Sequence, residues 1–170
     1  FPSVAPQDSN SRGWEICALV ADGSPRAGFG AQGCRSYQRT GGALADREFI
    51  ATAVAFDTQQ RILVAGVIER LGGTLYESGV ARFQLNGDRD ATFNSGEFLR
   101  LPPSTFTLQR PPRAVMPTLA GGILVAGPTL RSGFADQFAV VRLLSDGTAV
   151  DSSFGNAGVS VVTDGINPAR

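Results

Sequence analysis

An internal repeat constrains the fold of this chain more than any other feature. Three segments combine a strand-like start, an Asp-Gly or Asn-Gly pair and a phenylalanine: "ALVADGSPRAGFG" at 18–30, "RFQLNGDRDATFN" at 82–94 and "RLLSDGTAVDSSFG" at 142–155. Their phenylalanines, Phe29, Phe93 and Phe154, are almost evenly spaced. A second marker, "ILVAG", begins at Ile62 and again at Ile123, and this spacing is nearly the same. Two independent markers with one period indicate a repeat architecture.

The residues around these markers predict short strands. Apolar and β-branched runs occur at 51–56, 79–85 and 137–144, and no long window has the apolar stripe of a helix. The Asp-Gly and Asn-Gly pairs are hairpin signals because Gly and Asn accept positive φ. Four short strands per repeat predict an all-β fold of four-stranded, β-propeller-like blades.

The repeat resembles the delta-60 repeat, a bacterial β-propeller-type repeat, over roughly residues 14–165. Units of that family combine an apolar strand, a turn, "ILVAG", a strand that ends in Arg-Leu, and "DGxxDxxFG". In this chain Asn94 stands where the pattern has Gly, Arg26 stands where it has the acidic residue, and one extra residue precedes Asp151. The resemblance implies a propeller-type fold, and it implies no common reaction.

The pattern divides the chain into about two and a half units. We expect one β-repeat domain at 14–165, made of a half-blade at 14–40, a blade at 49–101 and a blade at 106–164, between an N-terminal extension at 1–13 and a C-terminal tail at 166–170. Closed propellers contain about four to eight blades. This chain alone is therefore expected to form an open propeller or one that a partner completes.

Three explanations of the unfinished circle stay open. The chain is a fragment of a longer propeller, or it pairs with itself or another chain along strand edges, or it folds as an open stack that protects its edges with Pro and charge. The Pro-rich segments at 101–103 and 110–113 are candidate edge guards or ordinary linkers.

The two cysteines flank the turn of the half-blade. By repeat alignment Cys17 corresponds to Val141 and Cys34 to Val159, which are expected to lie on paired strands. A disulfide would close a loop of about 16–18 residues, contribute roughly 3 kcal/mol and support a hairpin that is marginal alone. The alternative is two unrelated buried thiols. A disulfide predicts a periplasmic or secreted protein, and because the chain begins at Phe1 without Met, either a signal peptide has been removed or the chain is a fragment.

The composition argues against several classes of function. The sequence contains no His, which excludes a His-based catalytic triad or a His-ligated metal within this chain. All 15 basic residues are Arg and they balance 15 acidic residues, so charge does not favour nucleic acid or an anionic membrane. No run of about 18 apolar residues is present to span a bilayer. We therefore expect no catalytic residues and a protein that is not an enzyme.

The acidic turns are the remaining candidates for chemistry. Hard oxygen ligands on short loops suit calcium, and two carboxylates that face one cleft could serve general acid–base catalysis. The alternative is that these aspartates accept hydrogen bonds from nearby backbone N–H groups and cap the turns. The weak metal candidates are Asp88, Asp90, Asp146 and Asp151. The phenylalanines Phe29, Phe93 and Phe154 are expected to fill the core, one per unit.

Loops on a rigid β scaffold are the expected place for binding. The loops at 38–48, 69–78 and 128–137 combine Arg with aromatic residues, which are enriched at protein interfaces. Solvated loops are the alternative. The interface candidates are Trp14, Arg39, Arg47, Arg70, Tyr76, Arg131 and Phe134.

These observations predict a non-enzymatic, exported β-repeat protein that is a binding or structural accessory subunit of a larger assembly. Its partner would be another protein chain or a second copy, joined through the unfinished blade edges. Two alternatives stay open. The chain is a small subunit or fragment of a periplasmic enzyme whose catalytic groups lie on another chain, or it is a calcium-stabilised module that binds carbohydrate or a surface. No cofactor other than calcium is suggested.

Overall fold

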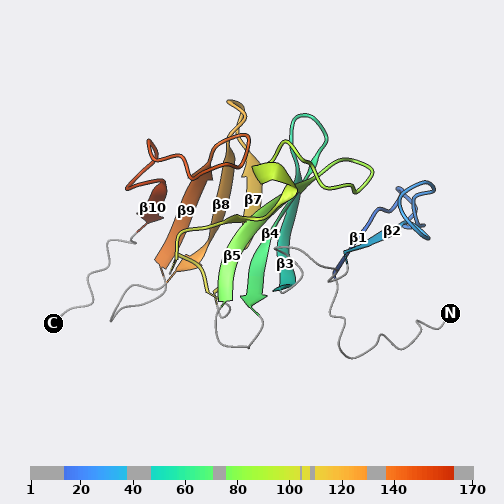
Figure 1. Cartoon of the computed structure of the whole chain (residues 1–170), viewed down its shortest axis with the longest axis horizontal. Helices are drawn as coiled ribbons and strands as arrows, with labels where there is room; N and C mark the ends of the chain where they lie inside the picture. Colours follow the sequence, from blue (N-terminus) through green and yellow to red (C-terminus); the bar gives the residue numbers. More distant parts are fainter. Residues whose placement is uncertain are drawn as a thin grey trace.

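The structure is a computed structural model that describes residues 14–37, 47–70, 76–103, 105–107, 110–129 and 137–162. Three groups of strands follow one another along the chain (Figure 1). The first group is β1 (Trp14–Cys17) and β2 (Cys34–Tyr37). The second is β3 (Arg47–Phe56), β4 (Ile62–Arg70), β5 (Tyr76–Phe83) and β6 (Leu99–Arg100). The third is β7 (Ala114–Pro117), β8 (Ile123–Thr129), β9 (Gln137–Leu143) and β10 (Val159–Val162).

Each group forms its own antiparallel sheet with consecutive strands as neighbours. The sheets have the orders β1-β2, β3-β4-β5-β6 and β7-β8-β9-β10, and both four-stranded sheets are open. A short 3-10 turn, η1 (Asn94–Gly96), lies between β5 and β6. Among the described residues no helix is long and apolar enough to cross a membrane. The predicted all-β fold of propeller-like blades is confirmed.

The second sheet lies between the other two and contributes to a core on each of its faces. Alternate residues of a strand point to opposite faces, and alternate residues of β4 enter different clusters. Leu63 and Ala65 join the cluster shared with the third sheet, whereas Ile62 and Val64 join the cluster that contains Phe29 of the first repeat. This two-sided burial explains why "ILVAG" is continuously apolar.

The first sheet covers only part of the second. Val64 and Ala81, on β4 and β5, are buried, whereas Val54 and Phe56 on β3 are 66% and 60% exposed. Val54 pairs with Val64 in the β3–β4 register, so the two side chains share a face. The first sheet therefore packs on only part of this face: Phe49 near the start of β3 is buried in the shared cluster, whereas the end of β3 stays exposed.

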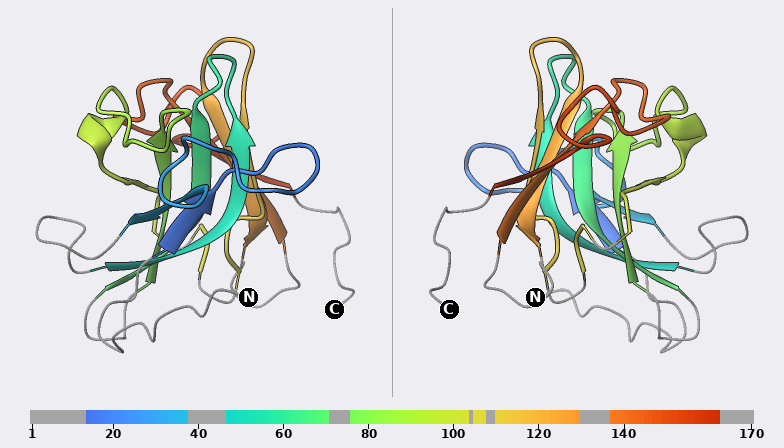
Figure 2. Two further views of the ribbon diagram at one scale, coloured as in Figure 1. Left: turned by 90° about the vertical axis from the view of Figure 1, so that its right-hand side faces the viewer. Right: turned by 90° about the vertical axis from the view of Figure 1, so that its left-hand side faces the viewer.

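The Pro-rich segment at 110–113 lies between the two larger sheets. Pro111 and Pro112 are buried, the Arg113 backbone N–H donates to the Ala126 carbonyl at 2.8 Å, and Thr52 Oγ1 donates to the Pro112 carbonyl at 2.6 Å. Because Thr52 lies on the edge strand β3, the segment both links the sheets and covers part of that edge, and the linker and edge-guard interpretations both stay open. The β3–β4 and β7–β8 turns point to the same end of the molecule (Figure 2).

Candidate functional site

Each repeat makes the same excursion after its third strand. In the second repeat, Gly87 N–H donates to the Gln84 carbonyl at 2.8 Å and Gly87 has a φ of 86°, a conformation that favours Gly. The chain then returns, because Asp90 N–H donates to the Arg82 carbonyl at 3.0 Å and Phe93 N–H donates to the Asp90 carbonyl at 2.9 Å.

The same hydrogen bonds recur in the third and first repeats and establish which residues are equivalent. Asp151 N–H donates to the Arg142 carbonyl at 2.8 Å, and Arg26 N–H donates to the Ala18 carbonyl at 2.8 Å. The extra residue before Asp151 is absorbed in the turn, where Leu144 N–H donates to Ala149. The equivalent sets are Ala18, Arg82 and Arg142, then Arg26, Asp90 and Asp151, then Phe29, Phe93 and Phe154.

Two of the three repeats hold an Arg–Asp–Phe module, which we define as Arg82, Asp90 and Phe93 in the second repeat and their three equivalents in the third. Arg82 Nε lies 2.6 Å from Asp90 Oδ2, and Arg142 Nε lies 2.8 Å from Asp151 Oδ2. In both modules the guanidinium carbon lies 4.9 Å from the centroid of the phenylalanine ring. The Arg is thus held by a charge and a ring at once.

Asp90 is the most completely buried charge of these modules, with 1% of its surface exposed. Burial alone would raise its pKa, but hydrogen bonds from the Thr92 hydroxyl and backbone N–H, and then from Arg82, outweigh burial and hold the pKa of Asp90 below its ordinary value. Arg61 Nη1 adds a longer contact at 3.4 Å. Asp90 therefore stays ionised as a structural anion.

The first repeat lacks both partners of this ion pair. Ala18 replaces the Arg, and Arg26 replaces the Asp. The joint between the first and second repeats is held in another way, because Tyr37 Oη donates to the Gly87 carbonyl and Arg35 pairs with Asp88. Burial raises the pKa of Tyr37 to about 12, which is consistent with a phenol inside this joint.

The module of one repeat receives the glycine turn of the next repeat. Arg82 Nη1 donates to the Ser145 carbonyl at 2.6 Å, and the Asn94 backbone N–H donates to the Asp146 carbonyl at 2.8 Å. A Cβ atom on Gly147 would lie 2.2 Å from the Phe93 ring, so only Gly fits beneath that ring. The same arrangement occurs one repeat earlier, where a Cβ atom on Gly87 would lie 3.0 Å from the ring of Phe29.

The module of the third repeat has no such cover in the part of the chain that the structure describes. The side chains of Arg142 and Asp151 are 33% and 24% exposed, whereas those of Arg82 and Asp90 are 3% and 1% exposed. Phe154 is half-buried, although its equivalent Phe93 is 1% exposed. The prediction that Phe154 is a core residue is therefore wrong, because no turn covers its ring among the described residues.

The residues of β8 and β9 next to this module are also more exposed than their equivalents in the second sheet. Leu63, Ala65 and Val80 are completely buried against the third sheet. Their equivalents on β8 and β9 are partly exposed. We call the surface formed by these equivalents and the third module the forward face; it comprises Leu124, Ala126, Val140, Arg142, Asp151 and Phe154. A surface that combines partly exposed apolar side chains with an Arg and an aromatic ring suits a protein interface.

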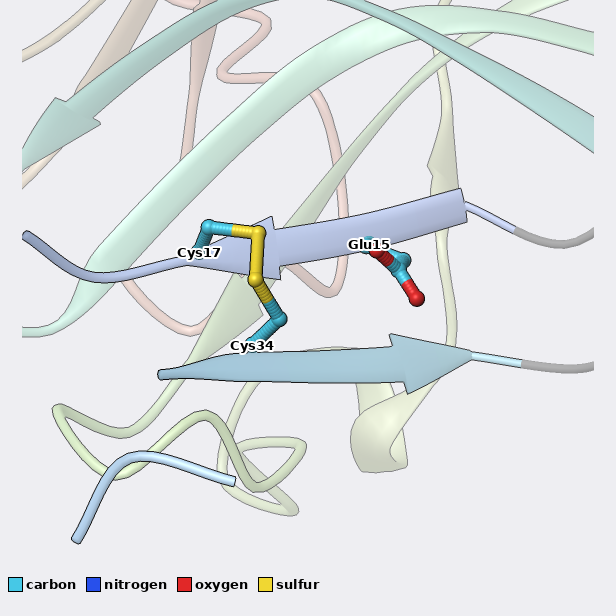
Figure 3. A group of neighbouring side chains, drawn as sticks. All are labelled: Glu15, Cys17 and Cys34. Carbon is cyan, nitrogen blue, oxygen red and sulfur yellow. A yellow bond between two sulfur atoms is a disulfide. The ribbon is translucent and has the colours of Figure 1, made fainter. Parts of the chain in front are cut away.

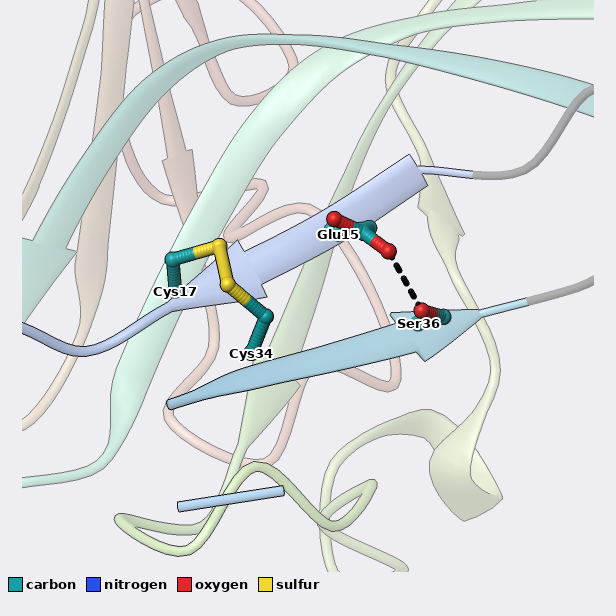
Figure 4. The surroundings of a disulfide bond; sticks show 4 residues. All are labelled: Glu15, Cys17, Cys34 and Ser36. Atoms are coloured by element: carbon teal, nitrogen blue, oxygen red, sulfur yellow. Dashed lines mark hydrogen bonds between the residues drawn. A yellow bond between two sulfur atoms is a disulfide. The ribbon is translucent and has the colours of Figure 1, made fainter. Parts of the chain in front are cut away.

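The opposite end of the molecule carries the disulfide. Cys17 and Cys34 are directly opposed in the β1–β2 register, and their sulfurs are joined (Figure 3). Val141 and Val159 are opposed in the same way on β9 and β10, so the predicted disulfide and its repeat alignment are confirmed. Glu15 lies beside the bridge and accepts a hydrogen bond from the Ser36 hydroxyl at 2.5 Å (Figure 4). Because both sulfurs form the disulfide, Glu15, Cys17 and Cys34 do not make a thiolate metal site.

A polar groove of about 410 Å³ lies where the β3–β4 turn meets the β7–β8 turn. Asp57 and Arg61 line it from the first turn, and Asp146 lines it from the third repeat. Their charges are already paired or satisfied locally: Arg61 Nε lies 2.7 Å from Asp57 Oδ2, and Asp146 accepts from Thr148 N at 3.0 Å. The groove therefore offers polar contact but no unpartnered catalytic group among its described residues.

The aspartates proposed as metal ligands cap turns or form ion pairs. Asp146 and Asp151 each accept from the backbone N–H two residues later, at 3.0 Å. Hydrogen bonds from the Thr148 backbone N–H and hydroxyl lower the pKa of Asp146, and hydrogen bonds from the Ser153 hydroxyl and backbone N–H lower the pKa of Asp151. Asp88 lies on the exposed turn and pairs with Arg35. The carboxylates do not converge on one cleft, and calcium binding by them stays a prediction.

The interface candidates lie elsewhere than sequence reasoning expected. Arg47 and Arg70 are paired in the β3–β4 register and Tyr76 begins β5, so these three residues belong to strand ends and not to loops. Trp14 begins β1. Arg39, Arg131 and Phe134 lie outside the described residues. Sequence reasoning missed the forward face, although the joint loss of the Arg and the Asp in the first repeat was a visible signal of the module.

Two segments, 61–93 and 121–154, match the family model of a β-propeller domain of unknown function (DUF5122). Each matched segment begins at or just before "ILVAG" and ends at the phenylalanine of a module. No curated protein and no solved structure matches the chain.

Proposed function

Because the chain carries repeats of the β-propeller type, we propose that it is a non-enzymatic binding or structural subunit that works by assembling with another protein chain. The forward face carries this proposal. The residues that the second repeat buries against its neighbour are partly exposed in the third repeat. The second and third repeats form the same surface, and among the described residues only that of the second repeat is covered. The uncovered copy is therefore suited to bind a further blade.

The chemistry of the described residues supports a role without catalysis. The sequence has no His, its two cysteines form the disulfide, and the aspartates of the turns are committed to Arg or to backbone N–H groups. General acid–base catalysis needs a group free to exchange a proton with substrate. A binding role needs only the surface.

The disulfide supports a location in an oxidising compartment. Disulfides persist in secreted and periplasmic proteins, and the Cys17–Cys34 bridge is compatible with an extracellular protein. We place the subunit in the periplasm or outside the cell, where the half-blade would keep its bridge.

The native mass of the purified full chain tests this function. We expect a mass above the 17.8 kDa of one chain by light scattering, with every co-purifying chain identified by mass spectrometry. A monomer with no partner at all would contradict the assembly role. Turnover of a substrate by the purified single chain would contradict the non-enzymatic role.

A further inference from the structure

We infer that the partner on the forward face is a second copy of this chain, which docks the Asp22-Gly23 turn of its half-blade against the Arg142–Asp151–Phe154 module. The two chains thus associate head to tail. This inference rests on the proposed function and names the partner and the contact.

The chain itself shows twice how the phenylalanine of a repeat packs on the turn of the next repeat, and in the second case the phenylalanine belongs to a complete module. Phe29 lies over the turn at Gly87, and Phe93 lies over the turn at Gly147. In the second case Arg82 also donates to the carbonyl of Ser145, the residue before the Asp-Gly pair. A complete module therefore binds a turn whose Gly lies in the left-handed region. The backbone carbonyl of the residue before the Asp-Gly pair accepts a hydrogen bond from the Arg of the module.

One turn of this kind is uncovered at the other end of the described chain. Gly23 has a φ of 84°, and a Cβ atom there would meet nothing within 4 Å. The residues at 19–28 are all exposed, including Leu19 at 62% and Val20 at 45%. The hydrogen bonds of this turn match those of the other two turns. Gly23 N–H donates to the Val20 carbonyl at 2.9 Å, and Ser24 N–H donates to Asp22 Oδ1 at 2.8 Å.

A two-stranded half-blade can cover part of a neighbouring sheet. Within the chain the first sheet keeps Val64 and Ala81 of β4 and β5 at 2% and 5% exposure while Phe56 on β3 stays exposed. Docked on the forward face, the half-blade of a second copy would likewise cover the β8 and β9 residues.

The numbers of repeats favour a closed pair. Each chain holds a half-blade and two four-stranded blades, so two chains joined at both ends would hold the equivalent of about five blades, within the roughly four to eight blades of closed propellers. Head-to-tail contacts form rings when the rotation closes. We therefore expect a mass about twice 17.8 kDa.

Two variants block opposite ends of the contact. Gly23→Asn places a side chain where the ring of Phe154 would lie, and Asn tolerates the left-handed backbone. Phe154→Ala removes the receiving ring. Gly96→Asn is the matched control, because Gly96 has a φ of 81° and a Cβ atom there meets only ordinary contacts at 3.8 and 3.9 Å.

Mixing makes the test specific to a head-to-tail contact. In light scattering at one protein concentration, we expect dimers for wild type and Gly96→Asn, and monomers for Gly23→Asn alone and Phe154→Ala alone. An equimolar mixture of the two blocked variants should recover dimers, because the Phe154→Ala chain supplies an intact turn and the Gly23→Asn chain supplies an intact module. A variant that had merely failed to fold would not be rescued.

The outcomes separate this inference from the proposed function. A wild-type chain that is monomeric but binds a different protein would overturn the second-copy inference and leave the assembly role standing. A wild-type dimer that Gly23→Asn does not weaken, or a mixture that recovers no dimer, would overturn the head-to-tail contact. A wild-type chain with no partner would contradict both.

Discussion

Arg82 and Arg142 are equivalent residues whose surroundings differ, because among the described residues the third repeat packs on Arg82 and no repeat packs on Arg142 in the same way. Both pair with an Asp at closely similar distances, and both stack on a phenylalanine at the same distance. The pair in the second repeat is buried, and the pair in the third is partly exposed to water. Breaking a buried pair leaves an uncompensated charge, whereas water solvates what remains of an exposed pair.

We therefore predict that Asp90→Asn lowers the free energy of unfolding by about 3–5 kcal/mol, and that Asp151→Asn lowers it by at most about 1 kcal/mol. The two substitutions remove the same carboxylate from equivalent positions, so each serves as the control for the other. Urea unfolding followed by circular dichroism measures both values. Equal losses would show that burial by the following blade does not set the strength of the pair.

The same carboxylate makes stability depend on pH. The pKa of Asp90 is lower in the folded protein than its ordinary value of about 3.9 in an unfolded chain. Asp90 therefore stabilises the fold fully above about pH 4, and this contribution is lost as pH falls through the folded pKa. We expect wild type to lose stability steeply below about pH 4 and Asp90→Asn to lose less over that range in acid melts. If wild type and Asp90→Asn lost stability equally at acid pH, Asp90 would not be the source of this pH dependence.

The contact between the second and third repeats depends on one glycine. Gly147 has a φ of 65°, and a Cβ atom on it would lie 2.2 Å from Phe93. Gly121 also has a positive φ of 86°, but there a Cβ atom meets Ser145 at an ordinary 3.6 Å. Conformational strain is thus comparable at the two positions, and only Gly147 lies under a ring.

Gly147→Ala should consequently cost much more stability than Gly121→Ala. We expect about 1 kcal/mol for Gly121→Ala from backbone strain and a further 1–3 kcal/mol or so for Gly147→Ala, because the Phe93 ring must move. Thermal melts monitored by calorimetry give the comparison. If both variants lost the same stability, the ring contact would not hold the joint.

The β1–β2 hairpin is the element least supported by packing. It has two strands, and hairpins of that size are marginal without further support. We expect Cys17→Ala/Cys34→Ala to lose about 3 kcal/mol in the chain-entropy estimate, with amide exchange rising in residues 14–37 and changing little in β7–β10. Hydrogen exchange followed by mass spectrometry resolves the two regions. A uniform rise over all three sheets would indicate that the bridge stabilises the whole molecule and not the hairpin.

Much of this element level could be predicted from the sequence. The turns at Gly23, Gly87 and Gly147 follow from local signals that recur once per repeat, and the disulfide follows from the places of its two cysteines in the repeat alignment. The contact between Phe93 and Gly147 could not be predicted, because it joins neighbouring sheets and depends on how they pack. The exposure of Phe154 has the same cause: a similar local sequence is buried or open according to what lies beside it.

At the scale of the whole molecule, the two ends of the described chain present complementary surfaces. Among the described residues, the turn of the first repeat has no module packed on it and the module of the third repeat has no turn packed on it. The first and third sheets lie on opposite sides of the second (Figure 1). In repeat proteins stability is approximately the sum of repeats and of the interfaces between neighbours. An interface supplied by another chain would therefore add to stability in the same way as the two internal ones.

This additivity makes the melting temperature depend on protein concentration, since association stabilises the folded state by mass action. We expect the wild-type melting temperature to rise with concentration and that of Leu124→Asn to stay constant, because Leu124 lies on the forward face and its equivalent Leu63 is completely buried by the neighbouring sheet. Leu119→Asn is the matched control: Leu119 is fully exposed on the β7–β8 turn, so this variant should keep the wild-type dependence. Calorimetry over a hundredfold range of concentration, about 10 to 1,000 times the dissociation constant, should shift the wild-type stability by nearly 3 kcal/mol. A wild-type melting temperature that did not move, or a Leu124→Asn variant that moved as wild type does, would mean that the forward face is not where chains meet.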